Sequence, residues 1–339
     1  MALRMKDIAA ELGISVSTVS RALKNDPHIS IETRTRVFEF VREKNYVKNR
    51  SLKKKIYYII DKKYFLFTSN FYNPLIQVIE EEVIKKGFEF HFTTIADAKN
   101  LFSKVDLKDI AGILMTSSYI ETLIPIFNEN NIPIVLVDSY LPLENTNAVL
   151  PDNSNGIMNA VKFLVEHGHK QIGYLEGDLQ DIDCADRLTG FKRGLELFEV
   201  PLCEETVLSC NLNMLSSYQA MMKFLKEHSE VPSAFIGAND VVTIGAMRAA
   251  KDFGLDIPED ISFIGFDDVD LSKDMVPSLT TVHVDRESLG LVAVQRLVQL
   301  INNEPIHYHK MLICTTIVER DSVANRSLLD TSDKEVSGH

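Results

Sequence analysis

The chain has 339 residues, of which 45% are hydrophobic, and a formal net charge of −12 at pH 7. This composition is ordinary for a globular protein of two or three domains. No apolar run approaches the ~18 residues that a membrane-spanning helix needs, which excludes a membrane protein. Charged residues interrupt the first apolar stretch, so we expect no signal peptide. The four cysteines form no CxxC pair and predict free thiols in a cytoplasmic protein.

Charge is divided unevenly along the chain. Residues 1–55 hold thirteen of the 36 basic side chains and only six of the 48 acidic ones, a net charge of +7. The remaining residues carry −19. A basic segment on an acidic body is typical of a protein that meets a polyanion with one domain only. We therefore expect the N-terminal segment to bind nucleic acid.

The stretch KDIAAELGISVSTVSRAL, from Lys6 to Leu23, predicts a helix-turn-helix. Ile8 and Leu12 lie one helical turn apart on the inner face of the first helix. Gly13 suits a left-handed turn position that other residues adopt only with strain. Ser15 can accept a backbone N–H as the cap of the second helix. A third helix is expected to follow from Ser30.

The outward residues of this motif suit contacts with duplex DNA. The methyl groups of Val16 match a thymine methyl, Ser17 can bond either base edge, and Arg21 can bind guanine with two hydrogen bonds. Hydroxyls such as those of Thr18 and Ser20 are better suited to phosphates. The full set of expected DNA contacts is Ser15, Val16, Ser17, Thr18, Ser20, Arg21, Lys24, His28, Arg34 and Leu52.

The rest of the chain alternates short apolar runs with helical patterns, beginning with IYYII at 56–60. This alternation predicts parallel sheets with helices on both faces. There are too many units for one sheet, and PDNSN at 151–155 is typical of a chain that crosses between two. We predict an α/β fold of two doubly wound parallel-sheet subdomains hinged around a cleft, preceded by a small all-α domain. Ligands of such sheets bind beyond the carboxyl ends of the strands.

Polar residues follow several of the predicted strands. Asp138 ends IVLVDS, Asn239 and Asp240 end FIGAND, and Asp267 and Asp268 end FIGFDD. For Asp240 and Asp268 a role as helix cap is an equal alternative. Arg187 opens a helix, and the aromatic pair before Asn73 offers a wall for a sugar ring. Carboxylates, an amide and an arginine together match vicinal hydroxyls. The expected effector contacts are Phe71, Tyr72, Asp138, Arg187, Asn239 and Asp267.

The motifs GISVSTVSRAL, FYNPLIQVIEEE, HGHKQIGYLEG, DRLTGF, FIGAND and PSLTTV resemble the lactose/galactose-repressor family of bacterial regulators. The resemblance implies a homodimer that binds an operator in double-stranded DNA and is controlled by a small sugar, with galactose or a β-galactoside favoured. It also implies that Arg187, Asn239 and Asp267 are the chief effector contacts, with Asp138 added.

We expect a helix-turn-helix domain at 1–48, which we call the head, and a linker at 49–55. The effector domain spans 56–323, its N-subdomain about 56–152 and 284–311, and its C-subdomain about 153–283 and 312–323. A polar tail occupies 324–339.

The sequence departs from the family pattern in the linker, which is about three residues short and has Leu52 as its only candidate for a minor-groove wedge. Ala185 stands where an aspartate is common. The tail lacks leucine heptads, which favours a dimer over a tetramer.

Alternative functions stay open within and beyond the family. A regulator of maltose or another oligosaccharide, and a corepressor-dependent global regulator, share the same pattern. A sugar-transport protein would need a signal peptide and no basic head. No catalytic, cofactor or metal-binding motif is present, and His167 and His169 are expected to lie at the surface as helix caps. We therefore expect no enzyme, no cofactor and no metal.

Overall fold

The structure is a computed structural model that describes residues 5–23, 26, 28–43, 55–67, 69–102, 105–142, 144–302 and 308–327. Its contacts divide the chain into two compact units, Met1–Lys53 and Lys54–His339. Lys24, Leu52 and all of the expected linker except Lys55 lie outside the described residues. No helix in the described part is long and apolar enough to cross a membrane.

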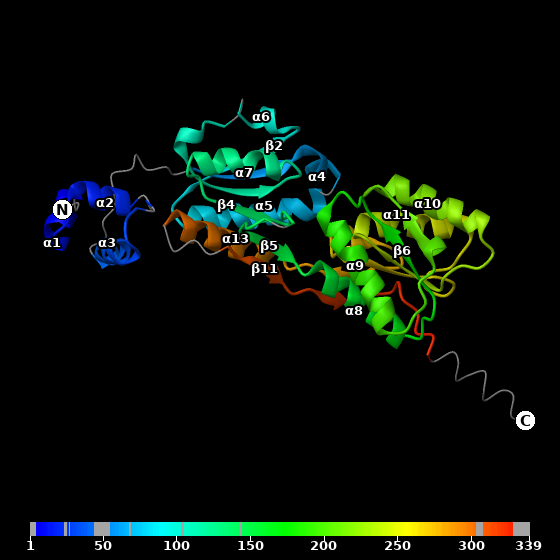
Figure 1. The fold of residues 1–339 in the computed structure, drawn as a ribbon. Coiled ribbons are helices and arrows are strands. Elements are labelled where there is room, and N and C mark those ends of the chain that lie inside the picture. Colours follow the sequence, from blue (N-terminus) through cyan, green and yellow to red (C-terminus); the bar gives the residue numbers. More distant parts are fainter. Residues whose placement is uncertain are drawn as a thin grey trace, which may run out of the picture. The chain divides into compact units, whose positions relative to one another are not determined.

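The head is a bundle of three helices, α1 (Met5–Leu12), α2 (Val16–Ala22) and α3 (Ile31–Glu43) (Figure 1). Ile8 and Ala9 of α1, Val19 and Ala22 of α2, and Val37 of α3 form its buried core. Gly13 adopts a φ of +65° between the first two helices. This left-handed turn lets the Ile14 N–H bond to the Ala9 carbonyl at 3.0 Å and ends α1.

The N-subdomain is built on a six-stranded sheet with the order β11-β5-β4-β3-β1-β2, in which every pair is parallel. Its strands are β1 (Lys55–Asp61), β2 (Glu89–Ile95), β3 (Ile110–Thr116), β4 (Ile134–Val137), β5 (Ala148–Pro151) and β11 (Lys310–Ile313). Its helices are α4 (Lys62–Phe67), α5 (Ser69–Lys85), α6 (Ala98–Phe102), η1 (Leu107–Asp109), α7 (Ile120–Glu129) and α13 (Arg286–Ile301). Alternate residues of β1 face opposite sides, so that Tyr58 packs with α5 and Ile59 with α7.

The C-subdomain has a second six-stranded sheet with the order β12-β10-β9-β8-β6-β7, parallel except for β12 against β10. Its strands are β6 (Ile172–Glu176), β7 (Val207–Ser209), β8 (Ala234–Gly237), β9 (Ser262–Asp267), β10 (Thr280–His283) and β12 (Thr316–Val318). Its helices are α8 (Asn153–Glu166), α9 (Ile182–Leu197), η2 (Glu204–Thr206), α10 (Met214–Glu227), α11 (Asp240–Phe253) and α12 (Asp270–Asp274). Residues of α8 and α9 pack in one core cluster, and those of α10 and α11 in another.

Three crossings join the subdomains, after β5, after β10 and after β11. The third crossing lies later in the chain than the sequence predicted. Leu312 and Ile313, assigned above to the C-subdomain, pair with Leu150 and Pro151 in the first sheet. The alternation of a short edge strand is too weak to fix such a boundary within two residues.

The polar tail also begins later than expected, because residues 324–327 are docked on the C-subdomain. The Ala324 N–H bonds to Ser262 Oγ at 3.0 Å, and the Arg326 N–H bonds to the His167 carbonyl at 2.8 Å. The expectation that His169 is a surface cap is wrong, since it is 2% exposed. Its ring bonds to Ser233 Oγ and to the Ala324 carbonyl, and burial lowers its pKa to about 4.

Candidate functional site

The start of α2 presents hydroxyl and methyl groups to solvent. Ser15 caps the helix, its Oγ accepting the Thr18 N–H at 3.0 Å. The same Oγ shares hydrogen bonds with Ser17 Oγ at 2.7 Å and with Thr18 Oγ1 at 2.8 Å. Val16 is 39% exposed, although it is a large apolar residue in a small domain. This end of the helix therefore offers an apolar contact beside adjustable hydroxyls, which suits a base edge.

Arg21 is exposed but already has a partner. Its Nε donates to Asp26 Oδ2 at 2.8 Å, and the other oxygen of Asp26 accepts from the His28 backbone N–H at 2.9 Å. These hydrogen bonds, first of all the one from Arg21, hold the pKa of Asp26 well below its ordinary value. Two of the expected DNA contacts, Arg21 and His28, are thus gathered around one carboxylate.

Arg34 was expected to face outward, but it is half-buried and supports the loop before α3. Its Nη2 donates to the Ile29 carbonyl at 2.9 Å and, at 3.4 Å, to that of Asp26. Ser30 caps α3 by accepting the Thr33 N–H. Arg34 therefore holds the segment that carries Asp26 and, with it, the side chain of Arg21.

In the effector domain, Asp138 follows β4 and Asp267 ends β9, each at the carboxyl edge of its sheet. Both have positive φ, 49° and 107°, a conformation that costs about 1–3 kcal/mol for a residue with a Cβ. Tyr72 donates its hydroxyl to Asp138 Oδ2 at 2.8 Å. Strain of this kind is retained where the direction of a side chain matters, and here it aims two carboxylates out of the strand ends.

Arg187 of α9 is 6% exposed and is held in one direction by several partners. Its Nε donates to Asn153 Oδ1 at 2.8 Å, and its Nη1 to the Ala238 carbonyl at 2.7 Å. Its Nη2 lies 3.4 Å from Asp267 Oδ1, and its guanidinium lies over the Phe266 ring at 3.9 Å. The long contact to Asp267 leaves that carboxylate oxygen open to a shorter hydrogen bond from a ligand.

Asn239 is buried, and its Oδ1 caps α11 by accepting the Val242 N–H at 2.9 Å. The neighbouring acids are structural. Asp240 accepts from the Val269 N–H and from the Thr281 hydroxyl. Asp268 is bound by Arg320 and by the His283 ring. The alternative that Asp240 and Asp268 are helix caps is wrong, because Asn239 caps α11 and Val269 precedes α12. Both acids are instead held by contacts with other segments.

The aromatic pair lies in α5. Phe71 and Tyr72 are 4% and 5% exposed, and their rings meet edge to face at a centroid distance of 5.1 Å. The guanidinium of Arg286, at the start of α13, lies 5.8 Å from the Phe71 ring. It also donates to the backbone carbonyls of Asp267 and Asp268 at 2.8 and 3.1 Å. Arg286 thus joins the N-subdomain aromatic pair to the C-subdomain strand end.

Burial perturbs the acids of this region. It raises the pKa of Asp138 to about 7, although Arg187 and the Tyr72 hydroxyl oppose the shift. Burial likewise raises the pKa of Asp267 to about 6 against Arg187 and Arg286. The pKa of Asp183 is raised well above its ordinary value by burial and by the charges of Asp138 and Asp181. The charge of Asp138 in the N-subdomain therefore acts on Asp183 in the C-subdomain.

Three residues of this cluster were missed by the sequence-based expectations: Asn153, Asp183 and Arg286. Asn153 connects two charged groups, accepting from Arg187 and donating to Asp183 Oδ1 at 2.8 Å. Asp183 was recognisable, because a residue four before Arg187 shares its face of the helix. Asn153 and Arg286 lie beside the crossings, where no local pattern marks them. In the described ranges, no group of three or more His, Cys, Asp or Glu is arranged to hold a metal ion.

Comparisons with known proteins agree along nearly the whole chain. Residues 4–49 match the model of bacterial regulatory proteins of the lacI family, and residues 161–323 match a periplasmic binding protein-like domain. The HTH-type transcriptional regulator MalR of Clostridium butyricum is 30% identical over 337 residues, covering 95% of this chain and all of MalR.

Solved structures give the same result. The lac repressor dimer bound to operator and the anti-inducer ONPF has a TM-score of 0.70 at 25% identity, covering 96% of this chain and 100% of that one. The transcriptional regulator CelR in complex with cellobiose has a TM-score of 0.74 at 24% identity, covering 94% and 99%.

Proposed function

This chain belongs to the lacI family of bacterial regulatory proteins, and we propose that it represses sugar-utilisation genes from an operator that it releases or holds according to a bound sugar. It is a transcription regulator with a helix-turn-helix DNA-binding domain and a sugar-binding domain. Its action on operator DNA places it in the cytoplasm. The relatives are regulators rather than enzymes, and the head makes a transport protein the weaker alternative.

The observation that carries the proposal is the presence, in one chain, of converging buried polar side chains at the strand ends and of an exposed reading helix. Asp138, Arg187 and Asp267 come from separate segments and are buried, fixed in direction and electrostatically coupled. Such a set of acceptors and donors orients sugar hydroxyls. Phe71 and Tyr72 supply the apolar wall, and Asn239 the amide. We favour galactose or a β-galactoside as the sugar, with maltose or another oligosaccharide as the alternative.

For the head we propose that Val16, Ser17 and Arg21 read bases. Ser15, Thr18, Ser20, Lys24, His28 and Arg34 would contact or position the phosphate backbone, and Leu52 would contribute from the linker. Support comes from the exposure of the α2 start and from the match of residues 4–49. A regulator of this type binds two half-sites as a dimer, so the operator is expected to be a near-palindrome.

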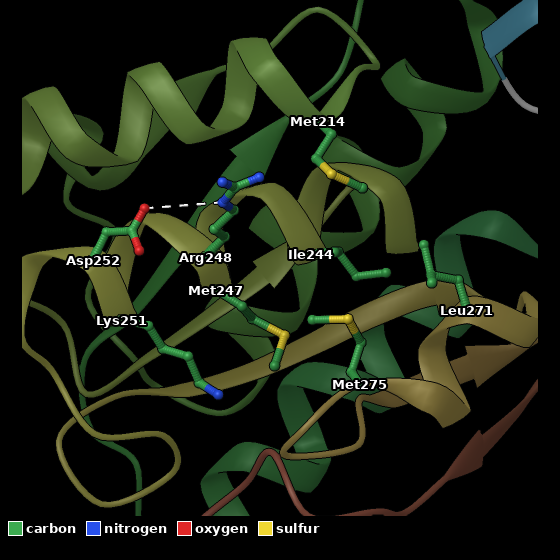
Figure 2. A pocket seen from close by; sticks show the side chains of 8 residues that line it. All are labelled: Met214, Ile244, Met247, Arg248, Lys251, Asp252, Leu271 and Met275. Atoms are coloured by element: carbon green, nitrogen blue, oxygen red, sulfur yellow. Dashed lines mark ion pairs between the residues drawn. The ribbon is translucent and has the colours of Figure 1, made fainter.

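We further propose that two copies associate through an apolar face of the C-subdomain. Met214, Ile244, Met247, Leu271 and Met275 line an open pocket of about 330 Å³ over α10, α11 and α12, rimmed by Arg248, Lys251 and Asp252 (Figure 2). Figure 2 shows Met247 and Met275 extending toward each other across it. Leu271 is 36% exposed, whereas Ile244 and Met247 form the buried floor of the pocket. An apolar hollow with adaptable methionines is typical of a self-complementary interface.

The dimer is tested by Leu271→Asp, which places a charge on this face at a residue that is 36% exposed. Sedimentation velocity should show a monomer for this variant and a dimer for the wild type. Leu197→Asp is the matched control, because Leu197 is 61% exposed on α9 away from the pocket. A dimeric Leu271→Asp protein would rule out this face as the interface.

The function as a whole is tested in two steps. Selection from random duplexes identifies the operator, and thermal shift against a sugar panel identifies the effector, since a ligand stabilises by RT ln(1 + [L]/Kd). Fluorescence anisotropy then measures operator affinity with and without that sugar. We expect the sugar to change affinity by roughly tenfold or more, within the usual range of allosteric coupling. Operator binding that no sugar alters would contradict sugar control and favour a corepressor-dependent regulator.

A further inference from the structure

The cleft contains an acid that the expected set of effector contacts omits. Asp183 lies in the first turn of α9, four residues before Arg187, and is 9% exposed. Its Oδ1 accepts from Asn153 Nδ2 at 2.8 Å, and Asn153 Oδ1 accepts from Arg187 Nε. Asn153 thus fixes Asp183 and Arg187 side by side, so both form part of the same wall of the cleft.

Asp138 lies in the N-subdomain, and one of its two carboxylate oxygens accepts no hydrogen bond from the described residues. Tyr72 occupies Oδ2, but Oδ1 is fully buried and has no hydrogen-bond partner among the described residues. A buried carboxylate oxygen without a donor costs free energy that a ligand can restore. The ionised carboxylate accepts only, so a ligand atom that meets Oδ1 in that form must be a donor.

The charges around this point do not balance. Asp138, Asp181, Asp183 and Asp267 face one buried cation, Arg187, which is already shared between Asn153, Ala238 and Asp267. Arg286 directs its guanidinium to backbone carbonyls and to the Phe71 ring, and Lys63 acts on Asp181. The raised pKa values of Asp138 and Asp183 reflect burial together with repulsion from neighbouring acids, whereas the pKa of Asp181 is raised by burial against Arg187 and Lys63.

We propose that the effector is a polyhydroxylated molecule carrying an amino group, which binds between Asp138 of one subdomain and Asp183 of the other. This rests on the proposed function, because it places the effector in the cleft. An ammonium supplies three donors and one positive charge, which satisfy Asp138 Oδ1 and offset the surplus of acid. A hydroxyl in its place supplies one donor and no charge. A phosphate adds repulsion.

The test is isothermal titration of the full-length protein near neutral pH with three matched probes: galactosamine, galactose and galactose 6-phosphate. The gluco series is titrated in parallel. We expect the amino sugar to bind roughly tenfold or more tightly than its parent, the factor contributed by one charge-assisted hydrogen bond. The phosphate should bind more weakly than the parent. A parent sugar or a phosphate that binds as tightly as the amine overturns the inference.

Two substitutions test which residues cause the preference for the amino sugar. Asp183→Asn keeps the shape and removes the charge, so the preference for the amine should fall to near parity while the parent sugar still binds. Glu196→Gln is the control, because it removes a charge from the exposed end of the same helix. Asp138→Asn serves as the second variant if Asp183→Asn does not fold. Retention of the full preference in Asp138→Asn or in a folded Asp183→Asn overturns the assignment.

The outcomes also separate this inference from the proposed function. If galactose or glucose binds and alters operator affinity but the amines do not bind more tightly, only the inference fails. If no amine, parent sugar or phosphate binds, the sugar-effector proposal fails and the inference fails with it.

Discussion

The head and the effector cleft hold their functional residues in opposite environments. In the head, Val16, Ser17 and Arg21 stand on the outside of a small core to which they contribute nothing. In the cleft, Asp138, Arg187 and Asp267 are each more than nine-tenths buried, and each also has a partner within the protein. Removing a charged group and its hydrogen bonds therefore changes the free energy of unfolding by different amounts in the two regions. In the head a substitution affects DNA binding alone, whereas in the cleft it affects ligand binding and folding together.

This contrast follows from the different exposure of the two regions to water. Exposed pairs exchange protein partners for water at little cost, whereas a buried charge that loses its partner keeps its full desolvation penalty. The predictions below test the contrast, from the largest expected effect to the smallest.

The largest effect is expected for Arg187→Met, which fills the space but removes the buried guanidinium of the expected effector site. Asp267, Asn153 and the Ala238 carbonyl lose their donor, so stability should fall by about 3–5 kcal/mol. Effector affinity should fall by roughly 2–4 kcal/mol. Denaturation and calorimetry measure the two. Arg193→Met, on the exposed face of the same helix, should change either by less than ~0.5 kcal/mol. Unchanged effector affinity in a folded Arg187→Met protein would contradict this role.

The next largest effect is expected in the pH dependence of the free energy of unfolding. Burial raises the pKa of Asp138 to about 7, so the folded state keeps a proton that the unfolded state, with an ordinary pKa, has already lost. This contribution is complete below about pH 4 and is lost as pH rises to about 7, by at most about 1.4 kcal/mol per pH unit.

Urea denaturation of the effector-free protein at pH 5 and pH 7 measures that slope. Asp138→Asn cannot titrate and should show less loss of stability over this interval than the wild type. His169 has the opposite dependence, because its pKa is lowered to about 4 and its contribution is lost as pH falls. Comparing the two proteins cancels that term. Equal slopes would show that Asp138 is already ionised in the folded state.

The same contrast between exposed and buried residues determines which features could be predicted from the sequence. The helix-turn-helix could be predicted residue by residue, because caps, the turn glycine and the outward positions all lie within eighteen residues. The strand-end acids could also be predicted, since every strand of a parallel sheet ends at the same edge. Asn153, Arg286 and the partner of Arg21 could not, because each acts through a contact with another segment or loop. Half-buried Arg34 and buried His169 show the same limit, since a charged or titratable residue carries no local sign of being covered.

In the head, Arg21→Ala should weaken operator binding roughly ten- to a hundredfold and relax the preference at one base position. The melting temperature should stay unchanged, because the side chain is exposed and its partner Asp26 is solvated. Anisotropy against a set of single-base operator variants measures both. Lys24→Ala should weaken binding to all duplexes alike and leave the base preference unchanged. An Arg21→Ala protein that keeps its base preference would show that Arg21 contacts only phosphates.

The smallest effect is expected for Asp26→Asn, which separates two roles of the Arg21–Asp26 pair. If the pair is merely an exposed ion pair, Arg21 leaves Asp26 for DNA at little cost, and operator affinity should change less than about threefold. We expect this outcome, since both side chains are partly solvated, at 51% and 25% exposure. If Asp26 instead holds Arg21 in the direction that guanine requires, Asp26→Asn should weaken the specific operator and spare unrelated duplexes. The single variant therefore distinguishes the two roles. Arg21→Ala combined with Asp26→Asn checks that any loss acts through Arg21, because the second substitution should then add nothing once Arg21 is gone.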